Sequence, residues 1–261
     1  MKIAVAGKGG VGKTFIAGTL ACTYAAKGLK TIAIDADTSP NLALTLGMTP
    51  EDAARILPIA ENQQLIDEKT KTDYPGVFKL SYTVDDIVSS QAVPTPCGVQ
   101  LLVMGMVRAM GAGCACPAHN LVRTLTSHLF VERKEVLIMD MEAGVEHLGR
   151  GTAKNVDILL IITDAHQASL VTAERIVNLA WPAGIPKIAY VANKVTNTDV
   201  KARIYESASN HNVPVLGCIP HDQDILTSGM LGKPVTTEAG YKAVAAVRTL
   251  AETLEQNFLS N

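Results

Sequence analysis

The glycine-rich segment near the N-terminus is the feature that most restricts the fold. Residues 7–14 read Gly-Lys-Gly-Gly-Val-Gly-Lys-Thr and fit the pattern Gly-x-x-x-x-Gly-Lys-Ser/Thr. The segment follows a short apolar run and precedes a stretch with helical periodicity, which is the context in which this pattern binds phosphate. Its glycines let backbone N–H groups converge on phosphate oxygens, and the helix N-terminus adds a positive dipole. The segment therefore predicts a nucleotide-binding α/β protein.

The same loop predicts which residues hold the nucleotide. The expected nucleotide is ATP or its product ADP; Lys13 is expected to contact the β- and γ-phosphates, and the Thr14 hydroxyl is expected to bind Mg²⁺. Lys8 is a second lysine in this loop, and spacing alone leaves open that it is a solvated surface residue. The other predicted contacts belong to the loop and to the helix start: Gly9, Gly10, Val11, Gly12 and Phe15.

The rest of the chain alternates between apolar runs and helix-period segments. The runs are mostly continuously apolar, which suits strands buried on both faces of a mainly parallel sheet. One helix is predicted over residues 14–27, and Gly28 is placed to end it. The alternation predicts an α/β fold with a doubly wound, mainly parallel sheet flanked by helices, and residues 1–261 as one domain. The predicted strands are residues 3–6, 31–34, 80–84, 100–104, 136–139, 158–163, 188–192 and 215–219.

Composition argues against several kinds of partner. The chain has a formal net charge of −2 and 4% aromatic residues, which disfavours a surface for nucleic acid or anionic membranes. The N-terminus has no signal-peptide pattern, and the longest apolar run, residues 158–162, is too short to span a bilayer. We therefore expect a cytoplasmic protein with no nucleic-acid or membrane partner.

The five cysteines are expected to be thiols or metal ligands, because a reducing compartment disfavours a disulfide framework. Cys22 and Cys218 lie within a predicted helix and a predicted strand, so we interpret both as core residues. Cys97 is expected to be exposed, and the sequence shows no partner for it.

Acidic residues follow two of the predicted strands. Asp35 and Asp37 come after residues 31–34, and carboxylates at the C-terminal end of such a strand lie beside the phosphate loop. Either of them could instead cap the following helix. Asp140 follows residues 136–139, where an acid can reach Mg²⁺ through a water molecule.

Residues 193–196 indicate which base is bound. In the pattern Asn-Lys-x-Asp the aspartate binds the N1 and N2 protons of guanine, and Thr196 stands in that position here. Asn193, which is followed by Lys194, can still hydrogen-bond a purine edge. The segment therefore favours ATP over GTP.

A cysteine pair suggests what the nucleotide energy is used for. Cys114 and Cys116 precede Pro117, which suits the first position of a helix, and a helix N-terminus lowers the pKa of a nearby thiol. Two thiolates are too few for Zn²⁺ or square-planar Ni²⁺, but two copies of the pair across a twofold axis supply four. The alternative is two small buried cysteines in a turn. The predicted helix carries a leucine stripe: Leu121, Leu125 and Leu129.

Residues 8–14 resemble the deviant Walker A motif of the MinD/ParA/nitrogenase-iron-protein class. The resemblance implies a homodimer in which Lys8 reaches the nucleotide of the partner subunit. It also implies that Asp37, the first residue of an Asp-x-x-x-Asn-Leu match, orients the attacking water. Residues 140–144 resemble the second switch, although Glu142 stands where proline is usual and its role stays open. The resemblance further assigns three residues to a loop that cups adenine: Pro220, His221 and Asp222.

A narrower resemblance covers nearly the whole chain. The Cys-x-Cys pair together with residues 139–148 and 150–154 closely resembles CooC-type nickel-insertion ATPases. It implies ATP-driven delivery of Ni²⁺, with Zn²⁺ as a possible substitute, to apo carbon monoxide dehydrogenase or acetyl-CoA synthase. The pair would bind the metal, while the role of the neighbouring His119 stays open.

Two other functions compete with metal delivery. An iron–sulfur electron donor would resemble the nitrogenase iron protein, but there the cluster cysteines are well separated in sequence, whereas here they lie two apart. A positioning ATPase of the MinD/ParA kind predicts an amphipathic tail or basic patches, and residues 256–261 offer neither.

Overall fold

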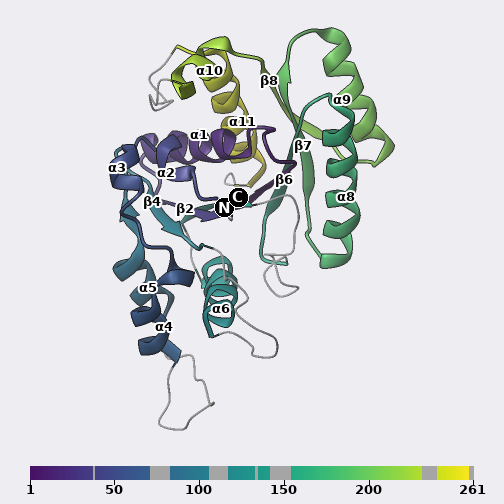
Figure 1. Cartoon of the computed structure of the whole chain (residues 1–261). Helices are drawn as coiled ribbons and strands as arrows, with labels where there is room; N and C mark the ends of the chain where they lie inside the picture. The colour runs from purple at the N-terminus through teal and green to yellow at the C-terminus, as the bar shows by residue number, and fades with distance from the viewer. Residues whose placement is uncertain are drawn as a thin grey trace.

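The computed structural model describes residues 1–37, 39–70, 83–105, 117–132, 135–141, 154–230 and 240–258. These residues form an eight-stranded sheet in the order β3-β4-β2-β5-β1-β6-β7-β8, with helices on both faces (Figure 1). Neighbouring strands are parallel except β3 and β4, so the predicted mainly parallel sheet is confirmed. The strands are β1 (Lys2–Ala6), β2 (Thr31–Ala36), β3 (Val93–Pro94), β4 (Gln100–Val103), β5 (Val136–Met141), β6 (Ile158–Thr163), β7 (Ile188–Val195) and β8 (Val215–Pro220).

Two helical layers cover the sheet. One face packs against α1 (Lys13–Ala26), α2 (Leu42–Thr45) and α11 (Lys242–Phe258). The other face packs against α4 (Gln63–Thr70), α5 (Val84–Gln91), α6 (Pro117–Glu132), α8 (Gln167–Ala183) and α9 (Thr198–Asn210). Short elements complete the described fold: α3 (Pro50–Ala53), the 3₁₀ helix η1 (Ile59–Glu61) and α10 (Gln223–Met230). No helix within these ranges is long and apolar enough to cross a membrane.

Most of the predicted boundaries hold. Gly28 ends α1 with a φ of 81°, and its N–H donates to the carbonyl of Ala25. Pro117 is the first residue of α6, as its position before the leucine stripe predicts. All three leucines of that stripe are fully buried.

The strand predicted at residues 80–84 is wrong where the structure describes it. Residues 80–82 lie outside the described ranges, and Val84 is the first residue of α5. Thr83 and Asp86 form a capping box in which each side chain accepts the backbone N–H of the other. The capping box pairs backbone N–H groups that have no partner within the first turn of a helix. This pairing favours a helix rather than a strand from Val84 onward.

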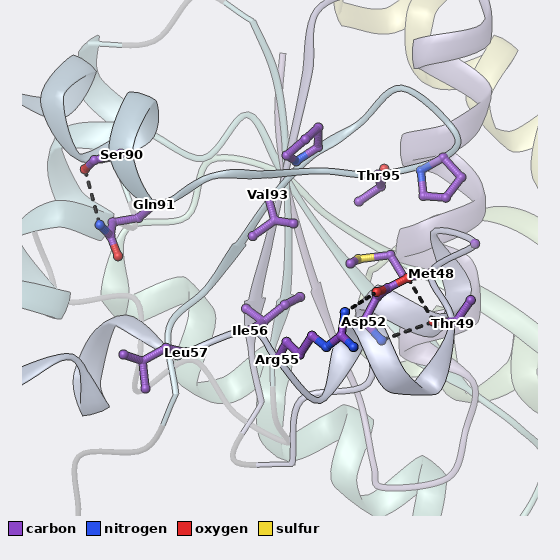
Figure 2. Close-up of a pocket in the computed structure, with 13 residues that line it drawn as sticks. Met48, Thr49, Asp52, Arg55, Ile56, Leu57, Ser90, Gln91, Val93 and Thr95 are labelled. Carbon is purple, nitrogen blue, oxygen red and sulfur yellow. Dashed lines mark hydrogen bonds and ion pairs between the residues drawn. The ribbon is translucent and has the colours of Figure 1, made fainter.

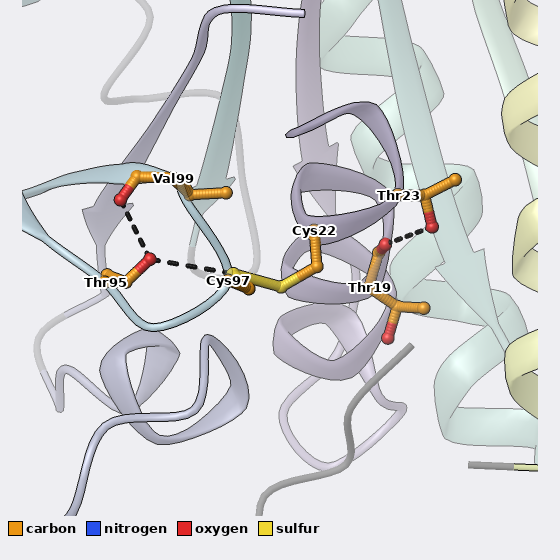
Figure 3. The surroundings of a disulfide bond; sticks show 6 residues. All are labelled: Thr19, Cys22, Thr23, Thr95, Cys97 and Val99. Atoms are coloured by element: carbon orange, nitrogen blue, oxygen red, sulfur yellow. Dashed lines mark hydrogen bonds between the residues drawn. A yellow bond between two sulfur atoms is a disulfide. The ribbon is translucent and has the colours of Figure 1, made fainter. Parts of the chain in front are cut away.

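The expectation of free thiols is wrong for two cysteines. Cys22 on α1 and Cys97 in the turn between β3 and β4 form a disulfide (Figure 3). They are separated by 75 residues, but packing of the turn on α1 brings their Cα atoms to 5.5 Å, within the range for a disulfide. Cys218 on β8 is a free thiol.

Candidate nucleotide-binding site

The phosphate loop leaves the C-terminal end of β1 and enters α1 in a conformation that only glycine adopts readily. Gly12 has a φ of 98° and precedes the first helical residue, Lys13. A Cβ atom on Gly7 would collide with the carbonyl oxygen of Ile162 on β6, and one on Gly12 would collide with the Asn193 side chain. The loop is therefore held against β6 and β7 at positions where no side chain fits.

The lysines of the loop occupy different environments. Lys13 is 6% exposed and donates from Nζ to the carbonyl oxygen of Lys8 at 3.5 Å, folding back over the loop. Lys8 is exposed, and its carbonyl also accepts the N–H of Val11 at 3.3 Å. The geometry suits Lys13 as the lysine that serves its own nucleotide, whereas Lys8 is exposed to solvent in the single chain.

Strand β7 braces the loop from two positions. The Nδ2 amide of Asn193, a buried residue, donates to the carbonyl oxygen of Val11 at 2.6 Å. Lys194, which has a φ of 55°, donates from Nζ to the carbonyl oxygen of Gly10 at 2.6 Å. The sequence suggests base recognition for this pair but not these contacts. Asn193 keeps its Oδ1 atom and a second amide hydrogen for a purine, so base recognition stays a prediction.

Asp35 organises the segment that carries Asp37. Its carboxylate accepts the N–H of Leu42 at 2.9 Å and that of Asp37 at 3.2 Å, so it caps α2 from a distance. Asp35 is 1% exposed, and burial raises the pKa of its carboxyl above the usual range. Asp37 is half-buried, and its Oδ1 atom accepts the N–H of Ser39 at 2.9 Å. The helix-capping alternative therefore applies to Asp35.

Asp140 is the register partner of Asp35 on the adjacent strand β5. It is 1% exposed, and neither carboxylate oxygen has a hydrogen-bond partner among the described residues. Burial raises the pKa of Asp140 to about 7; the Thr14 hydroxyl and the Lys13 charge act against this rise, whereas the charges of Asp35 and Asp37 add to it. Thr14 is close enough to lower this pKa without forming a hydrogen bond of good geometry.

A buried carboxylate without a partner is costly, and a divalent cation nearby removes that cost. Asp140 and the Thr14 hydroxyl lie beside each other at the start of α1, where a nucleotide phosphate would supply further oxygen ligands. These residues therefore fit Mg²⁺, and Thr14 and Asp140 would hold the ion beside the nucleotide phosphates; their binding of Mg²⁺ stays a prediction. The cation would neutralise charge on the phosphates.

The predicted adenine loop is partly a structural junction. Pro220 ends β8, and the N–H of His221 donates to the carbonyl of Val195 at 2.9 Å. The Asp222 carboxylate accepts the N–H of Asp224 at 3.1 Å and that of Ala243 at 3.0 Å, so it joins the starts of α10 and α11. The His221 side chain is exposed, and contact with adenine stays a prediction.

Asp164 was not predicted at this edge of the sheet. It follows β6 and is 7% exposed. Burial acts to raise the pKa of Asp164, but hydrogen bonds from His166 and Ser169 hold it below the usual range. The His166 Nδ1 atom lies 3.0 Å from Oδ1 of Asp164. An acid directly after a predicted strand is the signal that identified Asp35 and Asp140, and it applies here too.

The remaining predicted residues lie outside this description. Cys114, Cys116 and Glu142 lie outside the described residues, and His119 belongs to α6 but its side chain is not described. In the sequence, the segment with the cysteine pair lies between Gly105, which follows β4 and Met104, and Pro117 at the start of α6.

Comparison with known proteins identifies the family. The CobQ/CobB/MinD/ParA nucleotide binding domain family matches residues 2–235. The chain is 42% identical over 234 residues to the carbon monoxide dehydrogenase accessory protein CooC of Rhodospirillum rubrum, covering 89% of this chain and 88% of that protein. It is 40% identical over 242 residues to an uncharacterized ATP-binding protein of Methanocaldococcus jannaschii, covering 92% of each.

Solved structures agree on the fold. The septum site-determining protein MinD of Pyrococcus horikoshii, complexed with Mg-ADP, aligns with a TM-score of 0.63 at 18% identity. The alignment covers 98% of this chain and 96% of that chain. The chain is therefore a P-loop ATPase of the CobQ/CobB/MinD/ParA family, and within it belongs to the group of the carbon monoxide dehydrogenase accessory protein CooC.

Proposed function

We propose that two copies of this chain form an ATP-dependent metallochaperone that inserts Ni²⁺ into an apo-enzyme. The observation that carries the proposal is the 42% identity to CooC along 89% of the chain, combined with a Cys-x-Cys pair. That relative is a carbon monoxide dehydrogenase accessory protein, which supports apo carbon monoxide dehydrogenase as the client. Acetyl-CoA synthase is the second candidate client.

In this proposal the loop and the strand ends divide the work of hydrolysis. Lys13 binds the β- and γ-phosphates of its own subunit's ATP, and Thr14 with Asp140 holds Mg²⁺. Asp37 orients the attacking water, at a place set by the hydrogen bonds of Asp35 to the surrounding backbone. Lys8, exposed in the single chain, stabilises charge on the partner's transferring phosphate. Asn193 and His221 contact adenine.

The topology supports a metal site close to the nucleotide. β4 is parallel to β2, so the C-terminal ends of both strands lie at the same edge of the sheet, where Asp35 is the penultimate residue of β2. Met104, just after β4, donates its N–H to the carbonyl of Asp35 at 2.9 Å. In the sequence, the segment with Cys114 and Cys116 begins two residues after Met104. We therefore expect nucleotide-driven movement near Asp35 to alter the geometry of four thiolates, two from each subunit.

The proposal is tested by activating a purified apo-enzyme. Apo carbon monoxide dehydrogenase is mixed with the Ni²⁺-loaded protein and Mg·ATP, and CO oxidation is measured against free Ni²⁺ at the same concentration. We expect faster activation with the loaded protein, lost in Lys13→Ala and in Cys114→Ala, and retained in Cys218→Ser. The same assay with apo acetyl-CoA synthase identifies the client. Activation of neither enzyme beyond the rate with free Ni²⁺ would contradict the proposal, and a brown iron–sulfur chromophore would favour the electron donor.

A further inference from the structure

A disulfide joins the phosphate-binding helix to the edge of the sheet. Cys22 lies on α1 and is 4% exposed, whereas Cys97 lies half-buried in the turn before β4 (Figure 3). β4 runs parallel to the central strands. The turn before β4 therefore lies at the N-terminal ends of these strands, whereas the phosphate loop lies at their C-terminal ends. The bond can therefore act on the nucleotide site only through the elements between them.

The turn forms one wall of a groove of about 640 Å³, which we call the hairpin groove (Figure 2). Val93 and Pro96 line it from the hairpin, and Met48 and Ile56 line it from the opposite wall, with Val93 pointing toward Ile56 (Figure 2). Pro96 directly precedes Cys97 and packs against Gly47, where an added Cβ would lie 3.5 Å from Cβ of Pro96. The disulfide therefore fixes the wall that closes on Gly47.

Helix α2 connects the groove to the nucleotide site. Its first residue, Leu42, donates its N–H to the Asp35 carboxylate at 2.9 Å, and its last turn leads into Gly47. Thr45 packs so closely on α1 that a Cβ on Gly18 would collide with it. Ile56 lines both the hairpin groove and a second cavity of about 340 Å³ beside Asp35. Movement of the hairpin wall would therefore reach the segment that carries Asp37.

We propose that Cys22 and Cys97 form a reversible thiol–disulfide switch that sets the width of the hairpin groove and, through α2, the rate of ATP hydrolysis. A thiolate of a dithiol reductant attacks Sγ of Cys97, the less buried residue of the pair, while the Cys22 thiolate leaves and takes up a proton. The second thiol of the reductant then attacks the mixed disulfide and releases Cys97 as a thiol. Two electrons and two protons pass to the protein, the reductant becomes a cyclic disulfide, and a disulfide oxidant reverses the reaction.

The surroundings suit both redox states. Thr95 Oγ1 donates to the carbonyl of Val99 at 2.8 Å and lies 3.6 Å from Sγ of Cys97, so a reduced Cys97 can donate its S–H to the same hydroxyl. Cys22 as a thiol is a small apolar residue in the core beneath α1. Helix α1 stays packed without the bond because its stripe is fully buried: Ile16, Leu20 and Tyr24.

The test compares metal-free protein oxidised with glutathione disulfide and protein reduced with dithiothreitol, both without denaturant. Intact mass should rise by about 2 Da on reduction and fall again on reoxidation. Hydrogen exchange should quicken over residues 93–99 and over residues 44–57. The melting temperature should drop by roughly 10 °C, because the bond closes a long loop. ATP turnover should fall about fivefold while ADP affinity stays within about twofold.

Cys97→Ser is the matched control, because it removes the disulfide and retains the four other cysteines, which could respond to the same reagents. It should show the slow turnover and fast exchange of the reduced chain under both conditions. Cys22→Ala, which removes the same bond from the other side, should agree with it. A bond that resists dithiothreitol without denaturant would overturn the proposal. So would exchange over residues 44–57, or turnover, that does not differ between the two redox states. None of these readouts depends on nickel.

Discussion

The side-chain amide of Asn193 donates a hydrogen bond to the carbonyl oxygen of Val11 at 2.6 Å, across 182 residues of sequence. This bond ties the phosphate loop to β7, a strand that is separated from β1 by β6. The next residue, Lys194, makes a second bond to the carbonyl of Gly10. The loop is therefore arranged to bind phosphate before the nucleotide arrives, because two of its carbonyls are held from outside.

Asn193→Ala should weaken ADP and ATP binding about tenfold, because it leaves the Val11 carbonyl without its partner and frees the loop. Titration calorimetry measures both affinities. Asn197→Ala is the matched control: Asn197 accepts the N–H of Val200 and starts α9, away from the loop. It should cost some stability but no nucleotide affinity. Unchanged ADP affinity in Asn193→Ala would show that the hydrogen bond from Asn193 to Val11 does not help the loop to bind nucleotide.

Lys13→Ala should abolish ATP turnover, because the γ-phosphate loses its nearest cation. The folded chain should persist, since the Nζ atom of Lys13 makes only a 3.5 Å contact with the Lys8 carbonyl. Phosphate release measures turnover, and circular dichroism checks the fold. Hydrolysis near the wild-type rate in this variant would show that the loop does not serve as a phosphate site.

Lys8→Ala should keep ADP affinity within several-fold but lose hydrolysis and ATP-dependent dimerisation, since its role is on the other subunit. Light scattering with and without ATP measures the dimer. Lys187→Ala removes another lysine, one that lies over the Phe258 ring 4.2 Å from its centroid, and should leave both properties intact. A Lys8→Ala chain that dimerises normally with ATP would refute the assignment of this lysine to the partner's site.

Asp140→Asn should raise stability and abolish Mg²⁺-dependent hydrolysis. The pKa of Asp140 is about 7 in the folded chain against an ordinary value of 3.8. A raised carboxyl pKa means that the folded state binds the proton more tightly. Ionisation of Asp140 therefore lowers the free energy of unfolding progressively as pH rises from about 4 to about 7. Above pH 7 the total loss is about 4 kcal/mol. Removing the charge should raise the melting temperature at pH 8, and by less at pH 5.

Asp164→Asn is the control of opposite sign. The pKa of Asp164 is lowered, so its charge adds stability above the ordinary carboxyl pKa, and this stability is lost as pH falls. The variant should therefore melt below wild type at pH 8. An Asp140→Asn chain that also melts below wild type at pH 8 would contradict a buried carboxylate without a partner.

The sequence predicted the sheet well, since continuous apolar runs mark strands that are buried on both faces. It also predicted the end of α1 at Gly28 and the start of α6 at Pro117, where single residues carry the signal. The disulfide was missed because the pairing of Cys22 with Cys97 depends on how the hairpin packs on α1, and no local pattern records that packing. The start of α5 was missed because an apolar run outweighed the capping pair Thr83 and Asp86.

Site residues divide in the same way. Asp35 and Asp140 could be predicted because an acid at the end of a parallel strand marks the nucleotide-binding edge of the sheet. The hydrogen bond from Asn193 to the phosphate loop could not, because the sequence motif indicates only a contact with the nucleotide base. Asp164 carries the same strand-end signal, so the same reasoning applies to it.

Metal stoichiometry tests whether two chains share one metal site. Ni²⁺ or Zn²⁺ should bind at one ion per two chains through Cys114 and Cys116 of both, and should promote the dimer even without ATP. Binding should weaken as pH falls, because protons compete for the thiolates. Cys218→Ser should bind normally. One metal per chain, unchanged in the Cys114→Ala/Cys116→Ala double variant, would contradict the shared site and with it the metallochaperone.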